Sequence, residues 1–166
     1  MDVVIKLSSE MKLINEKIAK QNPSQLFEQY KLFVESAEKV SQRRDNANHF
    51  YLGLNALILS ISSYLGAAQQ NNLMYVVIPI AAILINLHWH NIIISFKNLN
   101  TGKFQVIHEL EALLPANLYK YEWEIIGKGE TKKYKPVTHI EKSIPIIFIG
   151  LYIVLLVLLI CANWFF

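Results

Sequence analysis

The chain alternates between charged stretches and long apolar stretches. No Asp, Glu, Lys or Arg occurs from Asn46 to Phe96, nor from Ser143 to Phe166. Helices of about 20 apolar residues are long enough to cross the ~30 Å hydrocarbon core of a bilayer, and the two stretches hold three such runs. One run alone could be the core helix of a soluble protein. Three together predict an all-α membrane protein with three transmembrane helices.

This pattern divides the chain into five segments. Only the polar run Gln69–Asn72 separates the first two apolar helices, so a tight turn joins them as an antiparallel hairpin. Both charged segments contain apolar residues at helical spacing and are predicted to fold together as a helical base against one membrane face. The segments are the N-terminal helices at 1–45, the first transmembrane helix and its turn at 46–72, the second transmembrane helix at 73–96, the helical loop at 97–142 and the third transmembrane helix at 143–166.

The 16 Lys and Arg residues predict the orientation of these helices. Eight of them precede the first span and eight lie between the second and the third, whereas the 69–72 turn and the C-terminal end have none. Because cytoplasmic loops are enriched in Lys and Arg, both basic segments are predicted to be cytoplasmic. The protein is therefore expected in the bacterial inner membrane, with a cytoplasmic N-terminus and a periplasmic C-terminus.

The N-terminal segment contains two predicted helices, separated by Asn22-Pro23. The first has a narrow apolar seam, formed by Val4, Leu7, Met11, Ile14 and Ile18. Such a seam is typical of a short coiled coil or of a helix that docks on a partner, and packing on the chain's own cytoplasmic part is the alternative. The second helix has an apolar stripe that runs on toward the first span, formed by Leu26, Tyr30, Phe33, Ala37 and Val40.

Two prolines, Pro115 and Pro145, limit where helices can begin and end in the second half of the chain. Apolar residues at helical spacing from Phe104 to Leu114 predict a helix that Pro115 ends. Thr138 to Glu141 has the form of a capping box and leads into the third span. Pro145 then implies either a kink in that helix or a new helix with Ser143 as its cap.

Composition narrows the classes of function. The net charge is only +3 and both signs are interleaved, so a nucleic-acid partner is not expected. The single cysteine, Cys161, excludes an intrachain disulfide and a metal cluster. The spans contain no Asp, Glu, Lys or Arg, and no phosphate loop, nucleophile elbow or HExxH motif occurs. We therefore expect no catalytic residues, no cofactor and no metal.

A stripe of small residues follows one face of the first predicted span. Small side chains allow helix backbones to approach closely, which drives helix association in lipid. The stripe is thus a candidate packing seam, either within the subunit or between subunits, and consists of Gly53, Ala56, Ser60, Ser63 and Ala67.

Polar residues in the first two spans have two interpretations. Asn55 and Ser62, next to the seam, and Asn86 in the second span are candidate pore-lining residues if an oligomer encloses a water-filled axis. Hydrogen bonding between helices is the alternative and is favoured for Asn55 and Ser62.

Four histidines are predicted to lie near the cytoplasmic boundary of the membrane. His88 and His90 are two residues apart and therefore point about 200° apart around a helix, which disfavours a shared metal ion. Imidazoles titrate near physiological pH, so these residues form a candidate pH-responsive boundary, with ordinary interfacial hydrogen bonding as the alternative. They are His49, His88, His90 and His139.

Three blocks of sequence carry a family resemblance. They are YKLFVESAEKVSQRRDNANHFYLGLNALILSISSYL (30–65), LNTGKFQVIHELEALLPANLYKYEW (99–123) and YKPVTHIEKSIPIIF (134–148). Together they resemble the RipA family of bacterial octameric inner-membrane proteins, named for a factor that supports intracellular proliferation of Francisella-like pathogens. The resemblance covers most of the chain beyond residue 25.

This resemblance implies a ring-shaped homo-octamer in the lipid bilayer and a role in virulence, that is, in growth inside host cells. On that basis we expect a scaffold or adaptor of the cell envelope, without catalysis, that supports environmental adaptation, including adaptation to pH, and that binds a cytoplasmic protein partner. The alternatives are an ion or small-solute channel formed by the oligomer and, by similarity of the first block, a membrane effector of a bacterial defence system.

Overall fold

A computed structural model describes residues 22–67, 72–128 and 137–165 of the chain, without the side chains of 66–67, 72–73, 138–139 and 162–165. The described part is helical and contains no strand. Three helices are long: α3 (Pro23–Ala67), α4 (Asn72–Glu111) and α7 (Ser143–Phe165). Two are short: α5 (Leu118–Ile125) and α6 (Val137–Glu141). The predicted helix at the start of the chain lies outside the described residues.

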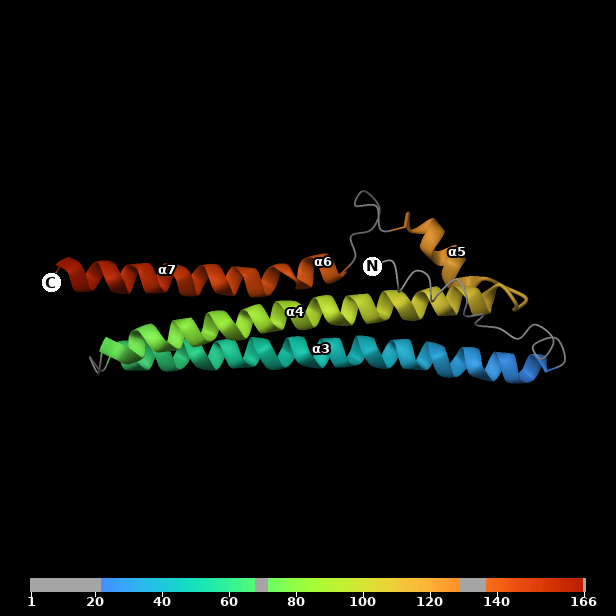
Figure 1. Cartoon of the computed structure of the whole chain (residues 1–166), viewed down its shortest axis with the longest axis horizontal. Helices are drawn as coiled ribbons and strands as arrows, with labels where there is room; N and C mark the ends of the chain where they lie inside the picture. Colours follow the sequence, from blue (N-terminus) through green and yellow to red (C-terminus); the bar gives the residue numbers. More distant parts are fainter. Residues whose placement is uncertain (1–21, 68–71, 129–136, 166) are drawn as a thin grey trace, which may run out of the picture.

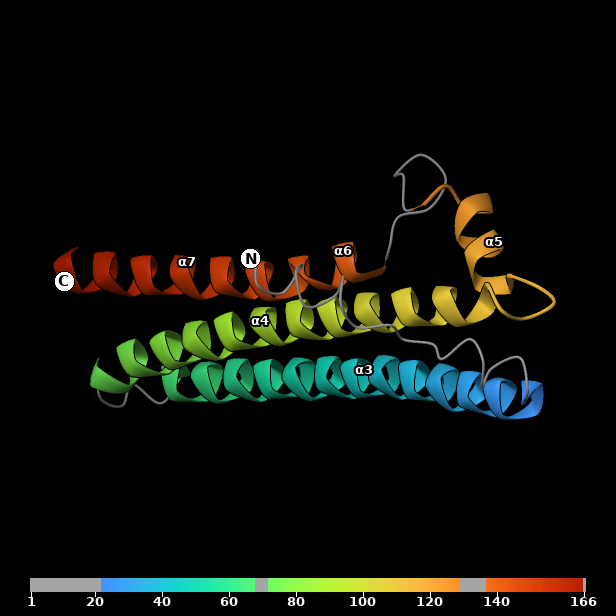
Figure 2. The same ribbon diagram turned by 45° about the vertical axis from the view of Figure 1, so that its right-hand side comes forward.

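The long helices form an elongated bundle in which α4 lies between α3 and α7 (Figures 1 and 2). α3 and α4 run antiparallel over most of their length, and α7 follows the first half of α4. One end of the bundle holds the start of α3, the end of α4 and α5, and is called the charged end below. At the other end, called the apolar end, α3 and α7 stop and α4 begins.

α3 is one continuous helix of 45 residues, about 67 Å long at 1.5 Å per residue. Its apolar stripe at Leu26, Ala37 and Val40 is buried against the rest of the bundle, and the same face continues through Asn48 and Asn55, which are also buried. The predicted stripe thus runs into the first apolar run without a break.

α4 joins two elements that the sequence treats as separate. The second apolar run and the predicted helix from Phe104 form one helix of 40 residues, which ends at Glu111, ahead of Pro115. Ile107 and Leu110 of its second half are buried on the same side as Trp89 and Ile93 of its first half. No glycine or proline occurs between residues 80 and 101, so nothing in the sequence interrupts the helix there.

A new helix, α7, begins just before Pro145, so the proline does not kink a longer helix. α6 ends at Glu141, and α7 begins at Ser143, which places Pro145 in its first turn. A backbone N–H in the first turn has no partner within the helix, so a proline there leaves the helix intact. Ser143 Oγ donates a hydrogen bond to the carbonyl of Ile140 at 2.6 Å, which ties the two helices together.

Two described helices, Met74–Glu111 and Ser143–Cys161, are long and apolar enough to cross a membrane. The apolar half of α3 is less hydrophobic, since Asn55, Ser60 and Ser62 interrupt it. It nevertheless runs beside the apolar half of α4 over its whole length (Figure 1).

Candidate functional site

The three long helices meet at a network of buried side chains in their apolar half, called the polar junction below. Nδ2 of Asn55 on α3 donates to Oδ1 of Asn86 on α4 at 3.1 Å, and Nδ2 of Asn86 donates back to Oδ1 of Asn55 at 2.8 Å. The hydroxyl of Tyr152 on α7 donates to the same Oδ1 of Asn55 at 3.1 Å. All three residues are completely buried.

The backbone completes the polar junction. Asn55 Nδ2 also donates to the carbonyl of Tyr51, and Asn86 Nδ2 to the carbonyl of Ala82, each at 2.8 Å. Each amide N–H₂ group therefore has two acceptors, which matches its two hydrogens. Polar groups in an apolar environment are costly unless they are paired, and these are paired within one subunit.

An aromatic layer follows the polar junction on the side of the charged end. Nε1 of Trp89 on α4 donates to Oδ1 of Asn48 on α3 at 3.0 Å, and both residues are buried. The Trp89 ring stacks on Tyr51 with ring centroids 5.5 Å apart and planes 10° apart, and it contacts Phe148 of α7 at 6.3 Å. The layer thus again joins all three long helices.

An ion pair continues the series toward the charged end. Nε of Arg44 on α3 lies 3.2 Å from Oε2 of Glu141 on α6, and the two side chains are only 18% and 15% exposed. Arg44, Asn48, Tyr51 and Asn55 recur at spacings of four, three and four residues, so they share one face of α3. This face therefore contacts α4, α6 and α7 in turn.

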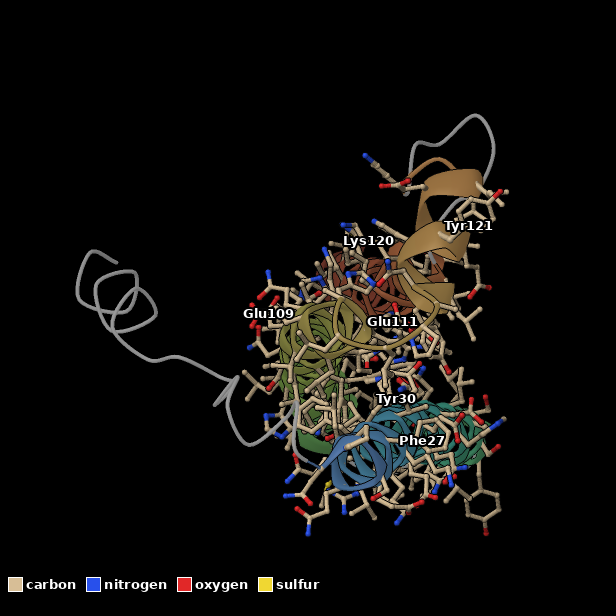
Figure 3. The ribbon with its side chains drawn as sticks, turned by 90° about the vertical axis from the view of Figure 1, so that its right-hand side faces the viewer. Phe27, Tyr30, Glu109, Glu111, Lys120 and Tyr121 are labelled. Atoms are coloured by element: carbon tan, nitrogen blue, oxygen red, sulfur yellow. The ribbon has the colours of Figure 1, made fainter. Side chains whose placement is uncertain are left out.

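A second network lies at the charged end, around the carboxylate of Glu111, and is called the Glu111 cluster below. Glu111 is completely buried at the end of α4. Its Oε1 accepts hydrogen bonds from the Tyr30 hydroxyl at 3.0 Å and from the Tyr119 amide at 2.9 Å, and its Oε2 accepts one from the Lys120 amide at 3.1 Å. Figure 3 shows Glu111 facing Tyr30, whereas Glu109 lies at the outer edge of α4.

Glu111 acts as the N-terminal cap of α5. The amides of Tyr119 and Lys120 belong to the first turn of that helix, where N–H groups lack partners within the helix and the helix dipole favours a negative charge. Asn117, at the N-cap position, makes no side-chain cap hydrogen bond. A carboxylate from α4 therefore replaces the usual local cap and attaches α5 to the bundle.

The Glu111 cluster changes the acidity of two tyrosines. Burial, followed by the hydrogen bond to Glu111 and its negative charge, raises the pKa of Tyr30 to about 12. Burial, followed by the negative charges of Glu38, Glu122 and Glu111, also raises the pKa of Tyr119. Both hydroxyls are therefore protonated at neutral pH, and Tyr30 can donate to the carboxylate.

Two hollows accompany these networks. One, of about 320 Å³, opens between α3 and α5, and is lined by Tyr30, Lys31, Val34, Glu35, Leu118, Tyr119 and Glu122. The other, of about 190 Å³, lies between the apolar ends of the three long helices, among residues that include Ser62, Pro79 and Leu155. The second hollow is mainly apolar and lacks charged residues, so it offers no chemistry.

The candidate packing seam lies on an open face of the subunit. Gly53, Ala56, Ser60 and Ser63 are all exposed, and a Cβ added at Gly53 would meet no atom within 4 Å. The hydroxyls of Ser60 and Ser63 donate to the carbonyls of Ala56 and Leu59 in their own helix. Gly53, Ala56 and Ser60 are therefore not used for packing within the subunit, whereas Ser63 also lines the hollow between the apolar ends of the long helices. The side chain of Ala67 lies outside the described residues.

The three candidate pore-lining residues are placed differently. Asn55 and Asn86 are brought together in the polar junction, and Ser62 is half-buried with its hydroxyl donating to the carbonyl of Ile58 at 2.7 Å. Hydrogen bonding between helices, the alternative given for Asn55, is what the subunit shows. A pore lined by these residues stays a prediction.

Of the boundary histidines whose side chains are described, His88 contacts the aromatic layer. His49 is exposed, with Nε2 3.7 Å from Oδ1 of Asp45. His88 is exposed with its ring 6.5 Å from that of Tyr51, and His90 is half-buried. The side chain of His139 lies outside the described residues. No group of three or more potential metal ligands occurs among the described side chains.

Sequence reasoning missed the Glu111 cluster and the partner of Asn86, although a signal was present. In a tight hairpin, residues equally distant from the turn lie at the same level. Asn55 and Asn86 are equally distant from the middle of the 69–72 turn, and so are Tyr30 and Glu111. Tyr152 and Glu141 carry no such signal, because a long segment separates them from the hairpin.

The fold defines the class of protein: a helical protein with two described helices that are apolar enough to cross a membrane, and with a charged end. Over residues 27–161 the chain matches the octameric membrane protein family (8xMP). That match covers most of the chain, so the protein belongs to this family, which confirms the expected resemblance to octameric membrane proteins. Comparison with curated proteins and with solved structures gives no match.

Proposed function

We propose that the protein is a non-catalytic scaffold of the bacterial inner membrane, built as a ring of identical three-span subunits. The observation that carries this proposal is the polar junction. Its amide N–H₂ groups are saturated inside one subunit, so these two buried asparagines keep no N–H for a substrate or an ion. What remains for interaction is the outer surface of the bundle and its base.

The apolar half of α3 is the third proposed membrane-spanning helix, beside α4 and α7. Tyr152 of α7 and Asn86 of α4, which both belong to apolar helices, hydrogen-bond to Asn55 at its centre. A helix joined at mid-membrane to two spans shares their depth. The positive-inside rule then puts the charged end in the cytoplasm and the apolar end in the periplasm. Alkaline phosphatase fused after Phe166 is expected to be active, and fused after Asp45 inactive.

The exposed small-residue seam on α3 is the proposed contact between subunits. In lipid, large apolar side chains need no cover, and close backbone approach through small residues favours association. Gly53→Leu is expected to dissociate the oligomer in mild detergent, because a large side chain prevents close approach of the helices. The subunit itself should keep its fold, since a Cβ at Gly53 meets no atom within 4 Å. Gly150→Leu on α7, where the space is equally open, is the matched control and is expected to keep the oligomer.

Conductance separates the scaffold from a channel. Purified oligomer in planar bilayers is expected to give no ion flux between acidic and alkaline pH. Reproducible single-channel steps that disappear in an Asn55→Leu variant would contradict the scaffold and support the pore.

Support of growth inside host cells, which the family resemblance implies, is tested by the intracellular growth of a deletion strain complemented with the Gly53→Leu variant.

A further inference from the structure

The short helix α5 exposes an apolar face outside the apolar half of the bundle. Leu118, Tyr121 and Ile125 are 67%, 66% and 57% exposed, and no residue of α5 is buried. Their spacing of three and four residues places them on one face. Tyr119, which contacts Phe104, lies on another face.

Exposure of these large apolar side chains costs free energy in water but not in lipid. Soluble surfaces rarely carry contiguous large apolar side chains unless another body covers them. An isolated helix of eight residues is also unstable, and α5 is attached mainly through its cap on Glu111. The face therefore needs a partner at the charged end of the bundle.

We propose that a second copy of this chain covers the face: α5 of one subunit packs against the cytoplasmic half of α3 of the next, around Leu32. The proposal rests on the ring of identical subunits proposed above. Leu32 is 65% exposed on α3. It is a large apolar side chain in a part of the helix that lies outside the membrane.

Symmetry limits the contact to the charged end of the neighbour, where Leu32 is the most exposed large apolar side chain of α3 among the described residues. Rotation about an axis along the membrane normal keeps every residue at its own depth, so α5 can meet only residues of the neighbour at its own level. α5 shares a groove with Tyr30 and Val34, which places it at that level of α3. Leu32 lies beside that groove on α3, about 60° around the helix from Glu35 and about 100° from Lys31, which also line it.

The two surfaces are different patches of the subunit, as a closed head-to-tail ring requires. Figure 3, viewed along the helices, shows Tyr121 at the outer edge of the subunit, whereas the first turn of α5 shares the groove with α3. A head-to-tail contact between two different patches generates a ring rather than a dimer. One subunit can therefore offer α5 to one neighbour and Leu32 to the other.

The charges beside the two surfaces are complementary. Glu122 and Glu124 border the apolar face of α5 and are exposed. Lys39 and Arg43 are exposed on the Leu32 side of α3 toward the membrane, whereas the acidic Glu28 and Glu35 flank Leu32 itself, so the charges are complementary on the membrane side of the contact. Opposite charges at the rim of an apolar contact favour correct docking over other orientations.

Cysteine cross-linking of the full-length protein tests the contact. In a Cys161→Ser background, the pair Leu32→Cys and Tyr121→Cys is expected to give a ladder of disulfide-linked multimers in membranes under mild oxidation. Each single variant is expected to stay monomeric on a denaturing gel, since identical residues do not meet in a head-to-tail ring. Dimers from Tyr121→Cys alone would overturn the proposal, because they indicate two α5 helices face to face.

Labelling with a membrane-impermeant maleimide gives a second readout. In the purified oligomer, Tyr121→Cys is expected to react at least tenfold more slowly than Lys120→Cys, which lies on the other side of the same helix. Equal rates would overturn the proposal and leave α5 for a different partner. If the oligomer keeps its size but shows neither the disulfide ladder nor the slow maleimide reaction, the contact proposed here is wrong and the proposed ring still stands. If the wild-type protein is monomeric, the proposed ring itself is wrong.

Discussion

The polar junction and the Glu111 cluster both join α3 to α4 with hydrogen bonds to buried side chains, but the first lies in the apolar half of the bundle and the second at its charged end. In the apolar half, neutral amides pair with each other and with a tyrosine hydroxyl. At the charged end, a carboxylate collects one hydroxyl and two backbone amides. A charged acceptor makes stronger hydrogen bonds and is more costly to bury alone.

The two networks therefore have different structural roles. In the polar junction the three helices are already held together by packing, so the amides mainly select the register between them. In the Glu111 cluster, a single side chain attaches an otherwise exposed helix. Changes at Glu111 should therefore affect stability and the attachment of α5 together, whereas changes at the polar junction should affect stability with little loss of helix.

The largest effect is expected for Glu111→Ala. Three donors lose their acceptor, and hydrogen bonds to charged groups contribute about 1.5–3 kcal/mol each, so we expect a loss of about 3 kcal/mol or more in unfolding free energy. Hydrogen exchange of the amides in α5 should accelerate at the same time. Glu109→Ala is the matched control: it removes an exposed carboxylate from the same turn of α4. Similar losses for the two variants would contradict the capping role.

A smaller effect is expected for Asn86→Leu, which conserves volume but leaves Asn55 with fewer partners. Hydrogen bonds between membrane helices contribute about 0.6–1.7 kcal/mol, so we expect a loss in that range in mixed-micelle unfolding. The double variant Asn55→Leu with Asn86→Leu should lose less than the sum of the two single changes, because no amide is left unpaired. Strict additivity would show that the two amides do not interact.

Hairpin geometry explains how much of these two regions was predictable. The apolar runs, the antiparallel pairing of α3 with α4 and the stripe along α3 follow from the pattern of residues, and equal distance from residues 69–72 pairs Asn55 with Asn86 and Tyr30 with Glu111. The use of Glu111 as the cap of α5 could not be predicted, because it depends on how the chain folds back after Pro115. The depth of Tyr152 likewise depends on packing rather than on local spacing.

A still smaller effect is expected for Tyr152→Phe. This change removes only the hydroxyl that ties α7 to Asn55, while the ring keeps its buried position. The expected loss is about 0.6 kcal/mol in mixed-micelle unfolding, the average for such bonds between membrane helices. Tyr64→Phe is the control, because Tyr64 is 75% exposed in the apolar half of α3. This change should leave the unfolding free energy unaltered. A loss at Tyr64 equal to that at Tyr152 would contradict the role of the junction.

The smallest effect at neutral pH, and the most specific to the Glu111 cluster, is the titration of Tyr30. Its pKa is about 12 in the folded protein, against 10.0 as the ordinary value, so the stability that it contributes is complete below pH 10 and is lost as the pH rises through 12. Subtracting the tyrosinate absorbance of a Tyr30→Phe variant from that of the wild type should give a single curve with a midpoint near 12. In Glu111→Gln, which removes the negative charge and keeps an oxygen acceptor, the midpoint should fall toward 10.0 but remain above it, since burial is the larger cause. An unchanged midpoint would show that the carboxylate does not act on Tyr30, and the contrast with the neutral polar junction would then have no electrostatic basis.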